Sequence, residues 1–404
     1  MAVPKLRFRA DDGSEFPEWK EKKLGEITQK VVRKADDKSM ADVRMISQGN
    51  GFILQSKKYS RENAGESLKK YTLLKKNEFA YNHGASKVKP YGVCYRLIES
   101  DETRVPYVYH TFRLKNGNED YWNYALNTSE MDKQLKKMVS SGVRMDGLLN
   151  INYETYMSIK VLIPSLPEQR KIADFLSAVD DAIAAQKAEV AAWEKRKKGV
   201  MQKLFSQEVR FKADDGSDFP DWEEKALGEI IREYREYHEK DGTYEHVSLT
   251  KDGVISKTER YDRDYLVKCV DKKYRVTHMN DICYNPANLK FGVICRNTYG
   301  DGIFSPIYVT YRVNESYDPI FIEALVVRDA FIQQALRFQE GTVYERMSVS
   351  PSDFESMFVS VPSLPEQRKI ADCFTSLGDV IAKAKDELDA WRELKKGLLQ
   401  QMFV

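Results

Sequence analysis

Two stretches of the sequence place a stripe of mostly apolar residues at a strict alternation of three and four positions. This spacing averages about 3.5 residues, which keeps one stripe of a helix facing a partner helix, as in a coiled coil. The first stripe is Ile172, Leu176, Val179, Ile183, Gln186, Val190, Trp193, Lys197, Val200 and Leu204. The second is Ile370, Phe374, Leu377, Ile381, Ala384, Leu388, Trp391, Lys395, Leu398 and Met402. We predict two helices of roughly 40 residues and about 60 Å, each able to be the other's partner.

Both helices begin with the same Leu-Pro-Glu-Gln-Arg-Lys-Ile-Ala sequence, which starts at Leu166 and at Leu364. The preceding Ser165 or Ser363 can cap the helix, and Glu168 or Glu366 can bond back to the capping residue. The proline occupies a position that needs no amide donor. Two ordinary amphipathic helices in separate cores are the alternative, which explains the register, length and duplication less well.

The duplication extends beyond the helices. Residues Arg7–Trp19 return as Arg210–Trp222, and Leu24–Ile27 returns as Leu227–Ile230. The shared Asp-Asp-Gly-Ser sequence is typical of a turn, so we expect a structural role for this segment. Between the repeated parts the two middles differ, and each combines short β-rich runs with helical stretches, as in a mixed α/β globule of roughly 150 residues.

Composition and charge narrow the possible partners. The chain is 42% hydrophobic, and its N-terminal region is charged and has no apolar signal core. No apolar run approaches the roughly 20 residues that span a bilayer, and the five cysteines have no paired spacing, so we expect a cytoplasmic protein with free thiols and no membrane contact. The net charge is +2, yet residues 30–91 contain 14 Lys and Arg against 6 Asp and Glu, whereas residues 233–296 contain 12 against 11. An anionic ligand would therefore meet local patches.

Sequence motifs of catalysis are lacking. The chain has no glycine-rich nucleotide loop, and its cysteines and histidines do not have the spacing of a zinc site. Asn285-Pro286-Ala287-Asn288 is similar to a motif of amino-group methyltransferases, but the equivalent segment, residues 82–85, has no proline. We predict no catalytic residue, no cofactor-binding residue and no metal site in this chain.

A set of polar side chains near glycines instead indicates binding to double-stranded DNA. Lys and Arg can neutralise phosphates, while Asn, Gln and Arg can read base edges through paired hydrogen bonds. In the first globule the candidates are Gln48, Asn50, Lys57, Lys58, Arg61, Asn82, His83, Ser86, Lys87, Lys89 and Arg144. In the second they are Ser248, Thr250, Lys251, Asn285, Asn288, Lys290 and Arg346. For any single residue a solvated loop side chain is the plainer interpretation, so the hypothesis depends on the whole set.

The duplicated helix sequences, each preceded by a variable globule that begins with Leu-Gly-Glu-Ile, resemble the specificity subunits of type I restriction-modification systems. The resemblance implies two target recognition domains that each read one half of an asymmetric bipartite DNA site, and two antiparallel helices that set the spacer. It also implies a non-catalytic chain in a bacterial or archaeal cytoplasm. Two modification subunits would carry S-adenosylmethionine and methylate the DNA, and restriction subunits would use ATP and Mg.

The expected fold class is therefore α/β (α+β) globular domains plus long α-helices, with an internal pseudo-twofold duplication. We expect the first target recognition domain in residues 1–163, a coiled-coil helix in 164–206, the second recognition domain in 207–362 and the other helix in 363–404. A coiled-coil scaffold that binds proteins without DNA specificity is the main alternative. A stand-alone DNA methyltransferase or nuclease is another, and it would require a cofactor or metal site.

Overall fold

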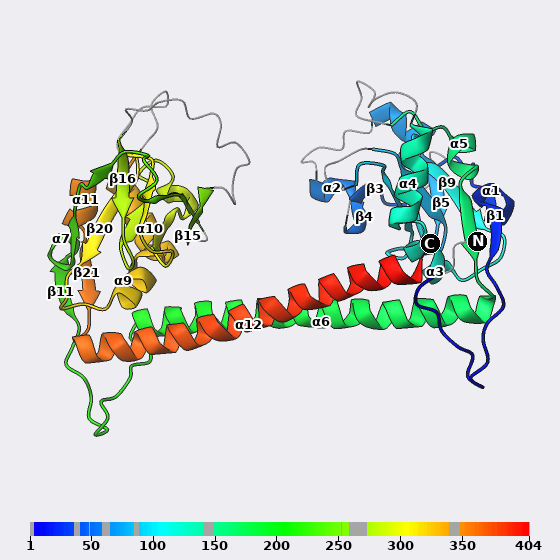
Figure 1. The fold of residues 1–404 in the computed structure, drawn as a ribbon. Coiled ribbons are helices and arrows are strands. Elements are labelled where there is room, and N and C mark those ends of the chain that lie inside the picture. The colour runs from blue at the N-terminus through cyan, green and yellow to red at the C-terminus, as the bar shows by residue number, and fades with distance from the viewer. Residues whose placement is uncertain are drawn as a thin grey trace. The chain divides into compact units, whose positions relative to one another are not determined.

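A computed structural model describes residues 4–35, 41–47, 49–58, 65–84, 89–139, 149–251, 253–257, 273–338 and 348–403, without the side chains of Lys58 and residues 65–67. The chain forms two compact units. Unit 1 comprises Met1–Lys187 and Glu387–Val404, and unit 2 comprises Ala188–Asp386. Each unit therefore contains one globular part and segments of two long helices (Figure 1).

The two long helices are α6 (Leu166–Phe205) and α12 (Leu364–Met402). In unit 1 the start of α6 lies beside the end of α12, where Lys395 Nζ donates to Asp180 Oδ1 at 2.5 Å. In unit 2 the end of α6 lies beside the start of α12, where Lys385 Nζ is 2.7 Å from Glu194 Oε1. The pairing is antiparallel in both units, and every residue of the two predicted stripes is buried or half-buried. Among the described residues, no helix has the length and apolar character required to cross a membrane.

The globular part of unit 1 is built on an antiparallel sheet with strand order β2-β9-β6-β7. Its strands are β2 (Thr28–Lys30), β9 (His110–Leu114), β6 (Phe79–Asn82) and β7 (Val93–Arg96). The same globular part contains three further antiparallel pairs: β1 (Lys20–Lys23) with β10 (Lys160–Ile163), β3 (Arg44–Ser47) with β4 (Gly51–Leu54), and β5 (Thr72–Lys75) with β8 (Glu102–Val105). Its shorter helices are α1 (Leu24–Ile27), α2 (Gln55–Lys58), η1 (Gly65–Lys70), α3 (Glu119–Ala125), α4 (Ser129–Met138) and α5 (Tyr153–Met157).

Local sequence explains where the short helices of unit 1 begin. Asn118, Thr128 and Asn152 precede α3, α4 and α5, and the side-chain oxygen of each accepts a backbone N–H from the first turn. These bonds satisfy donors that the helix itself leaves unpaired. The caps therefore set the start of each helix that covers the sheet.

The core of unit 1 combines residues from distant parts of the chain. Phe79 and Phe112 stack across the sheet with ring centroids 5.5 Å apart, and both side chains are fully buried. Ile172 and Leu176 of α6 belong to the same buried cluster, as do Met402 and Phe403 at the end of α12. In Figure 1 the C-terminus lies beside α3, and the ring of Phe403 is 5.5 Å from that of Tyr121. The end of α12 is thus part of the core of unit 1.

The globular part of unit 2 repeats this plan with a larger second sheet. An antiparallel sheet of order β12-β20-β17-β18 contains β12 (Ile231–Glu233), β20 (Val309–Val313), β17 (Ile282–Tyr284) and β18 (Ile294–Arg296). A five-stranded sheet contains β13 (Tyr237–His238), β16 (Tyr274–Thr277), β19 (Gly302–Phe304), β14 (Glu245–Thr250) and β15 (Gly253–Ser256), where β14 and β19 are parallel. The edge pair is β11 (Glu223–Ala226) with β21 (Phe358–Val361), and the shorter helices are α7 (Leu227–Ile230), η3 (Leu289–Phe291), α9 (Pro319–Val326), α10 (Asp329–Ala335), η4 (Leu336–Phe338) and α11 (Pro351–Ser356).

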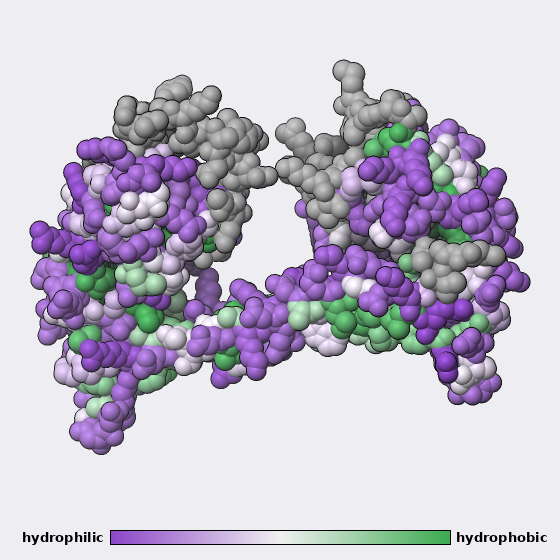
Figure 2. Space-filling view, in the orientation of Figure 1, coloured by the Kyte–Doolittle hydropathy of each residue, from purple (hydrophilic) through white to green (hydrophobic). Residues whose placement is uncertain are grey.

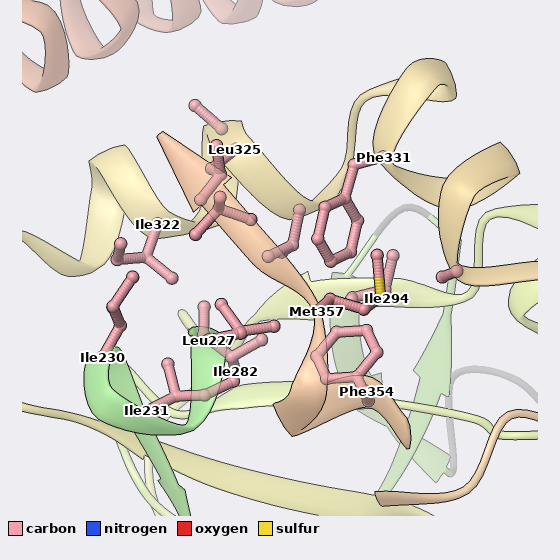
Figure 3. Close-up of a cluster of buried hydrophobic side chains, with 14 of the residues drawn as sticks. Leu227, Ile230, Ile231, Ile282, Ile294, Ile322, Leu325, Phe331, Phe354 and Met357 are labelled. Carbon is pink, nitrogen blue, oxygen red and sulfur yellow. The ribbon is translucent and has the colours of Figure 1, made fainter. Parts of the chain in front are cut away.

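The core of unit 2 is shown in Figure 3, where Leu227 and Ile230 of α7 lie against Ile322 of α9 and Met357, just after α11. Leu204 at the end of α6 and Phe374 near the start of α12 belong to the same buried cluster. Burial of this kind stabilises by about 25 cal/mol per Å² of apolar surface, so the helix ends contribute to the stability of the globular parts. The core of each unit therefore includes side chains from the start of one long helix and from the end of the other.

Candidate nucleic-acid interface

A buried ion pair connects the N-terminal repeat to the start of α6 in unit 1. The Glu168 carboxylate is fully buried, and Arg7 donates to it through Nε at 3.0 Å and Nη2 at 2.9 Å. Trp19 Nε1 also donates to Glu168, at 3.0 Å. The Ser165 hydroxyl accepts the Glu168 N–H at 3.4 Å, as expected of a cap. In a capping box the Glu168 carboxylate would accept a hydrogen bond from the N–H of the capping residue. Here the carboxylate binds Arg7 instead, because the guanidinium offers two charge-assisted hydrogen bonds.

Unit 2 contains the same ion pair at the start of α12. Arg210 donates to the buried Glu366 carboxylate through Nε at 3.1 Å and Nη2 at 2.8 Å. The indole differs between the units, because the buried Trp222 Nε1 finds no hydrogen-bond partner within the described part of the chain. The hydroxyl of Ser363 is also buried and finds none there.

The glutamine that follows each glutamate joins the helix start to a loop of the globular part. Gln169 Oε1 accepts the Asn118 N–H at 2.9 Å, and its Nε2 donates to the Pro164 carbonyl at 2.9 Å. Gln367 does the same with the Asp318 N–H and the Pro362 carbonyl, at 2.9 and 2.8 Å. The repeated Glu-Gln pair therefore holds each globular part on its helix. The contacts of Arg7 and Trp19 with Glu168 agree with the structural role expected of residues 7–19.

Two candidate DNA contacts of unit 1 are exposed on the β3–β4 hairpin and the turn of helix that follows it. Asn50 lies at the hairpin tip, where the Gly49 N–H donates to the Tyr95 hydroxyl at 3.0 Å and supports the turn. Lys57 lies on α2, directly after β4, and is exposed. Both side chains are accessible to a ligand.

Three other candidates of unit 1 are engaged within the protein. His83 is buried, and its two ring nitrogens lie 2.8 and 3.0 Å from the carbonyls of Leu149 and Val108, which argues against a contact with DNA. Asn82 is half-buried, and its side-chain oxygen accepts the Gly84 N–H at 3.0 Å. Lys89 Nζ donates to a backbone carbonyl at 3.2 Å. Gln48, Arg61, Ser86, Lys87, Arg144 and Arg346, and the side chain of Lys58, lie outside the described residues.

The candidates of unit 2 divide in a similar way. Lys251 is exposed in the turn between β14 and β15, and Lys290 is exposed on η3. Asn288 is half-buried, and so is Thr250, whose hydroxyl donates to the Gly253 carbonyl at 2.9 Å. Burial argues against Ser248 and Asn285 as base contacts, since Ser248 is 7% and Asn285 is 5% exposed. Asn285 Oδ1 also accepts the Ala287 N–H at 3.1 Å, which makes it a turn residue.

Two arginines of the basic stretch in the first globule lie beside acidic residues of the same stretch. Arg33 pairs with Glu78, and Arg44 lies 3.8 Å from Asp42. Figure 2 shows a largely hydrophilic visible face on both units. The lysines of residues 30–91 that are exposed in the described part of the chain are Lys30, Lys34, Lys57, Lys69, Lys70, Lys75 and Lys76. The positive charge available to phosphates therefore comes mainly from lysines.

An exposed aromatic residue of unit 2 was missed by the sequence analysis. Phe291 on η3 is 66% exposed, and Lys290 Nζ lies 5.1 Å from its ring. An aromatic face beside a cation is suited to stacking against bases and neutralising phosphates. In the sequence, the adjacent Gly292 was the one indication of an exposed turn at this position. In the structure it ends the turn with a φ of +73°.

Buried titratable groups of the sheets have little chemical reactivity. Burial raises the pKa of the Cys94 and Cys295 thiols to about 12, so both stay protonated near neutral pH. Burial also raises the pKa of Asp281, although hydrogen bonds from the Tyr234 hydroxyl and the His278 N–H oppose the shift. These groups belong to the internal packing of the sheets.

Known proteins resemble this chain in sequence. Residues 17–192 match the family described as the type I restriction modification DNA specificity domain. The type I restriction enzyme MjaVIII specificity subunit of Methanocaldococcus jannaschii is 23% identical over 296 residues, which cover 67% of this chain and 67% of that protein. The putative type I restriction enzyme MjaX specificity subunit of the same organism is 23% identical over 308 residues, covering 72% of this chain and 68% of that protein. Over residues 17–192 the chain therefore belongs to the family of type I restriction modification DNA specificity domains.

Solved structures with a fold similar to that of this chain support the predicted architecture. The S subunit of a type I restriction-modification system from M. genitalium has a TM-score of 0.54 at 15% identity, covering 100% of this chain and 99% of that chain. A chain from a structural study of complex assembly and conformational transition of the type I R-M system has a TM-score of 0.55 at 13% identity, covering 96% of this chain and 98% of that chain. The predicted fold class is confirmed.

Recognition of DNA sequence is therefore the function of this specificity subunit, and a coiled-coil scaffold without DNA specificity is not favoured. The division of the chain at residues 163, 206 and 362 remains a prediction. The compact units follow another division, because each takes a segment of both long helices.

Proposed function

We propose that this chain is the non-catalytic subunit that selects the DNA target of a type I restriction-modification complex in the cytoplasm. The globular part of each unit reads one half of an asymmetric bipartite site, and α6 and α12 set the spacer and dock two modification subunits. Those subunits carry S-adenosylmethionine, and restriction subunits with ATP and Mg join through the complex. The proposed DNA contacts of the described chain are Asn50, Lys57, Asn82, Lys89, Thr250, Lys251, Asn288, Lys290 and Phe291.

The observation that carries the proposal is the combination of one attachment with two different globular parts. Arg7–Glu168 and Arg210–Glu366 attach the globular parts to their helices with nearly the same distances. The strands outside the four-stranded sheet differ between the units. In unit 1 they form separate two-stranded pairs, whereas in unit 2 five of them form one sheet. Constant attachment with variable reading surfaces is what two half-sites of different sequence require.

The lengths of α6 and α12 supply a physical basis for the spacer. An insertion of four residues lengthens a helix by about 6 Å, which equals roughly two base pairs at about 3.4 Å per pair. The boundary between the units falls at Lys187 and Ala188 in α6, away from either globular core. An insertion there changes the helix without altering the residues that would read DNA.

The test is sequencing of methylated sites in cells that express the chain with its modification subunits. We expect the natural chain to produce one bipartite motif. Four residues inserted between Lys187 and Ala188 should alter the preferred spacer and leave both half-sites unchanged. Insertion of four residues in the exposed turn after Gly242 is the matched control and should keep the spacer. The old spacer in the helix variant would refute the role of the helices, and loss of one half-site would show that the insertion disturbs a reading surface.

A further inference from the structure

Unit 2 contains a pocket of about 720 Å³ where the end of α6 meets the junction of α9 and α10 and the middle of α12. Apolar side chains line much of it, among them Met201, Phe205, Val327 and Ile381. Lys197, Lys198, Arg328 and Lys385 bring positive charge to the same pocket. We call this the unit 2 pocket.

Unit 1 contains a pocket of about 500 Å³ in the corresponding place, between α6, the junction of α3 and α4, and the end of α12. We call this the unit 1 pocket. The repeat relates Lys395, Lys396 and Leu399 of this pocket to Lys197, Lys198 and Met201 of the other, and Ile183 to Ile381. A pocket that recurs at equivalent positions of a duplicated chain fits two copies of one partner.

Lys395 of the unit 1 pocket is neutralised within the chain. Lys395 Nζ donates to Asp180 Oδ1 at 2.5 Å, and the Tyr124 hydroxyl donates to Asp180 Oδ2 at 2.8 Å. The same ammonium lies 5.3 Å from the ring of Tyr124. A half-buried cation is thus matched by one carboxylate and one aromatic ring.

The unit 2 pocket lacks both matching groups. Gly378 occupies the position of Asp180, and Ala324 occupies that of Tyr124. A Cβ at Gly378 would lie 3.9 Å from Lys197 Nζ, so the missing carboxylate leaves space beside the ammonium. No ion pair of Lys197 is formed within the described chain, although Lys198 pairs with Asp329 and Lys385 with Glu194.

A second cation of the unit 2 pocket is also without a carboxylate among the described residues. Arg328 lies over the ring of Phe205 at 4.0 Å, and its Nε donates to the Leu325 carbonyl at 3.0 Å. Arg328 is half-buried, and this burial lowers its pKa to about 10. Lys197 and Arg328 lie beside the apolar side chains of the pocket, so the pocket favours a ligand that carries both a carboxylate and apolar groups.

We propose that the unit 2 pocket binds a segment of the modification subunit in which a carboxylate is flanked by apolar side chains. This inference rests on the proposed function, in which α6 and α12 dock two such subunits. The same segment meets a unit 1 pocket in which Lys395 is already paired with Asp180. Two identical subunits therefore bind unequally, and the subunit at unit 2 depends more strongly on salt.

The repeat itself supplies the variants for a test. Gly378→Asp places in unit 2 the carboxylate that unit 1 has, and Asp180→Gly removes it from unit 1. Gly378→Asn is the matched control, since it adds similar bulk without charge. Thermal unfolding of each full-length variant establishes that it folds before binding is compared.

The measurement is a titration of the full chain with purified modification subunit, at low and high salt, in which native mass spectrometry separates the first and second binding steps. We expect one strongly and one weakly salt-sensitive step in the natural chain. Gly378→Asp should weaken the strongly salt-sensitive step about tenfold, and Gly378→Asn much less. Asp180→Gly should make both steps strongly salt-sensitive.

Equal salt dependence of both steps in the natural chain, or equal effects of Gly378→Asp and Gly378→Asn, would overturn the inference. If those complexes still methylate one bipartite DNA motif, the proposed function stands while the inference fails. If the modification subunit bound neither the natural chain nor any of the variants, both the proposed function and this inference would be overturned. Octanoate is the probe for a small-molecule occupant, and its binding to the chain with an unchanged subunit titration would also overturn the inference.

Discussion

The buried glutamates at the starts of α6 and α12 provide the sharpest test of how the globular parts are held. Glu168→Ala and Glu366→Ala remove equivalent carboxylates from the two units. Both variants leave an arginine without its acid, but only Glu168 also accepts a hydrogen bond from an indole in the described structure. The two variants should therefore differ in cost.

The expected costs follow from burial and from the remaining partners. Loss of one partner of a buried ion pair costs about 3–5 kcal/mol. Arg7 is 23% exposed and keeps the carbonyls of Phe16 and Pro17 as acceptors, which reduces the expected cost to about 2–3 kcal/mol. Leaving Trp19 Nε1 unpaired adds about 1–2 kcal/mol. We expect about 4 kcal/mol for Glu168→Ala and about 2–3 kcal/mol for Glu366→Ala.

Hydrogen exchange of the full chain measures both costs, because mass spectrometry reads peptides from the start of α6 and of α12 separately. The free energy of local opening should fall more in unit 1 than in unit 2. Trp19→Phe and Trp222→Phe are the matched controls. Trp19→Phe should lower the opening free energy of its unit by about 1 kcal/mol, whereas Trp222→Phe breaks no hydrogen bond of the described structure and should change it little.

Equal losses in the two glutamate variants would refute the contribution of the Trp19 hydrogen bond. Losses below about 1 kcal/mol in both would refute the ion pairs as the attachment of the globular parts.

Two further predictions concern DNA affinity and pH. Replacing Lys57, Lys58 and Arg61 with Ala should weaken binding to every DNA sequence and reduce the salt slope by about 0.9 per lost phosphate contact, which a salt-titrated binding assay measures. Lys136→Ala, at an exposed position of α4, is the control, and an unchanged slope would remove this patch from the interface. His278 lies 2.8 Å from Asp301 and 3.2 Å from Glu236, and although burial opposes the charge, these carboxylates raise its pKa. Its stabilising effect is complete below about pH 6.5 and is lost as pH rises through the raised pKa, so His278→Gln should flatten the pH dependence of urea unfolding of unit 2 above about pH 6.5. Equal pH dependence in both proteins would contradict this role.

The helical part of the fold could be predicted because its signals are local. The stripes from Ile172 and from Ile370 are repeated apolar positions in one continuous segment, and no distant residue is needed to interpret them. The bond that Glu168 makes could not be predicted in the same way. Sequence offered the nearby Ser165 and its backbone, whereas folding brings Arg7 from 161 positions away. A buried charge takes the stronger, charge-assisted partner when one is within reach.

The candidate site shows the same limit more strongly. His83 and Lys57 are both polar residues near glycines in the sequence, yet His83 is enclosed by the carbonyls of Leu149 and Val108 while Lys57 is exposed. Exposure depends on which strands cover a loop, and residue type does not reveal this. Phe291 is the opposite case, since its aromatic side chain indicates a core position and the structure leaves it exposed.

By itself, the sequence determined the two long helices, the duplication and the resemblance to specificity subunits, because periodicity and repeated motifs are properties of neighbouring residues. The tertiary structure decided which half of each helix belongs to which unit. A core buries the apolar side chains that pack against it, whatever their distance in the sequence, and the ring of Phe403 packs beside that of Tyr121. It also decided that Lys395 has a carboxylate at Asp180 whereas Lys197 faces the space beside Gly378. The two lysines are identical in the sequence pattern, and the difference between them arises from residues that folding brings alongside.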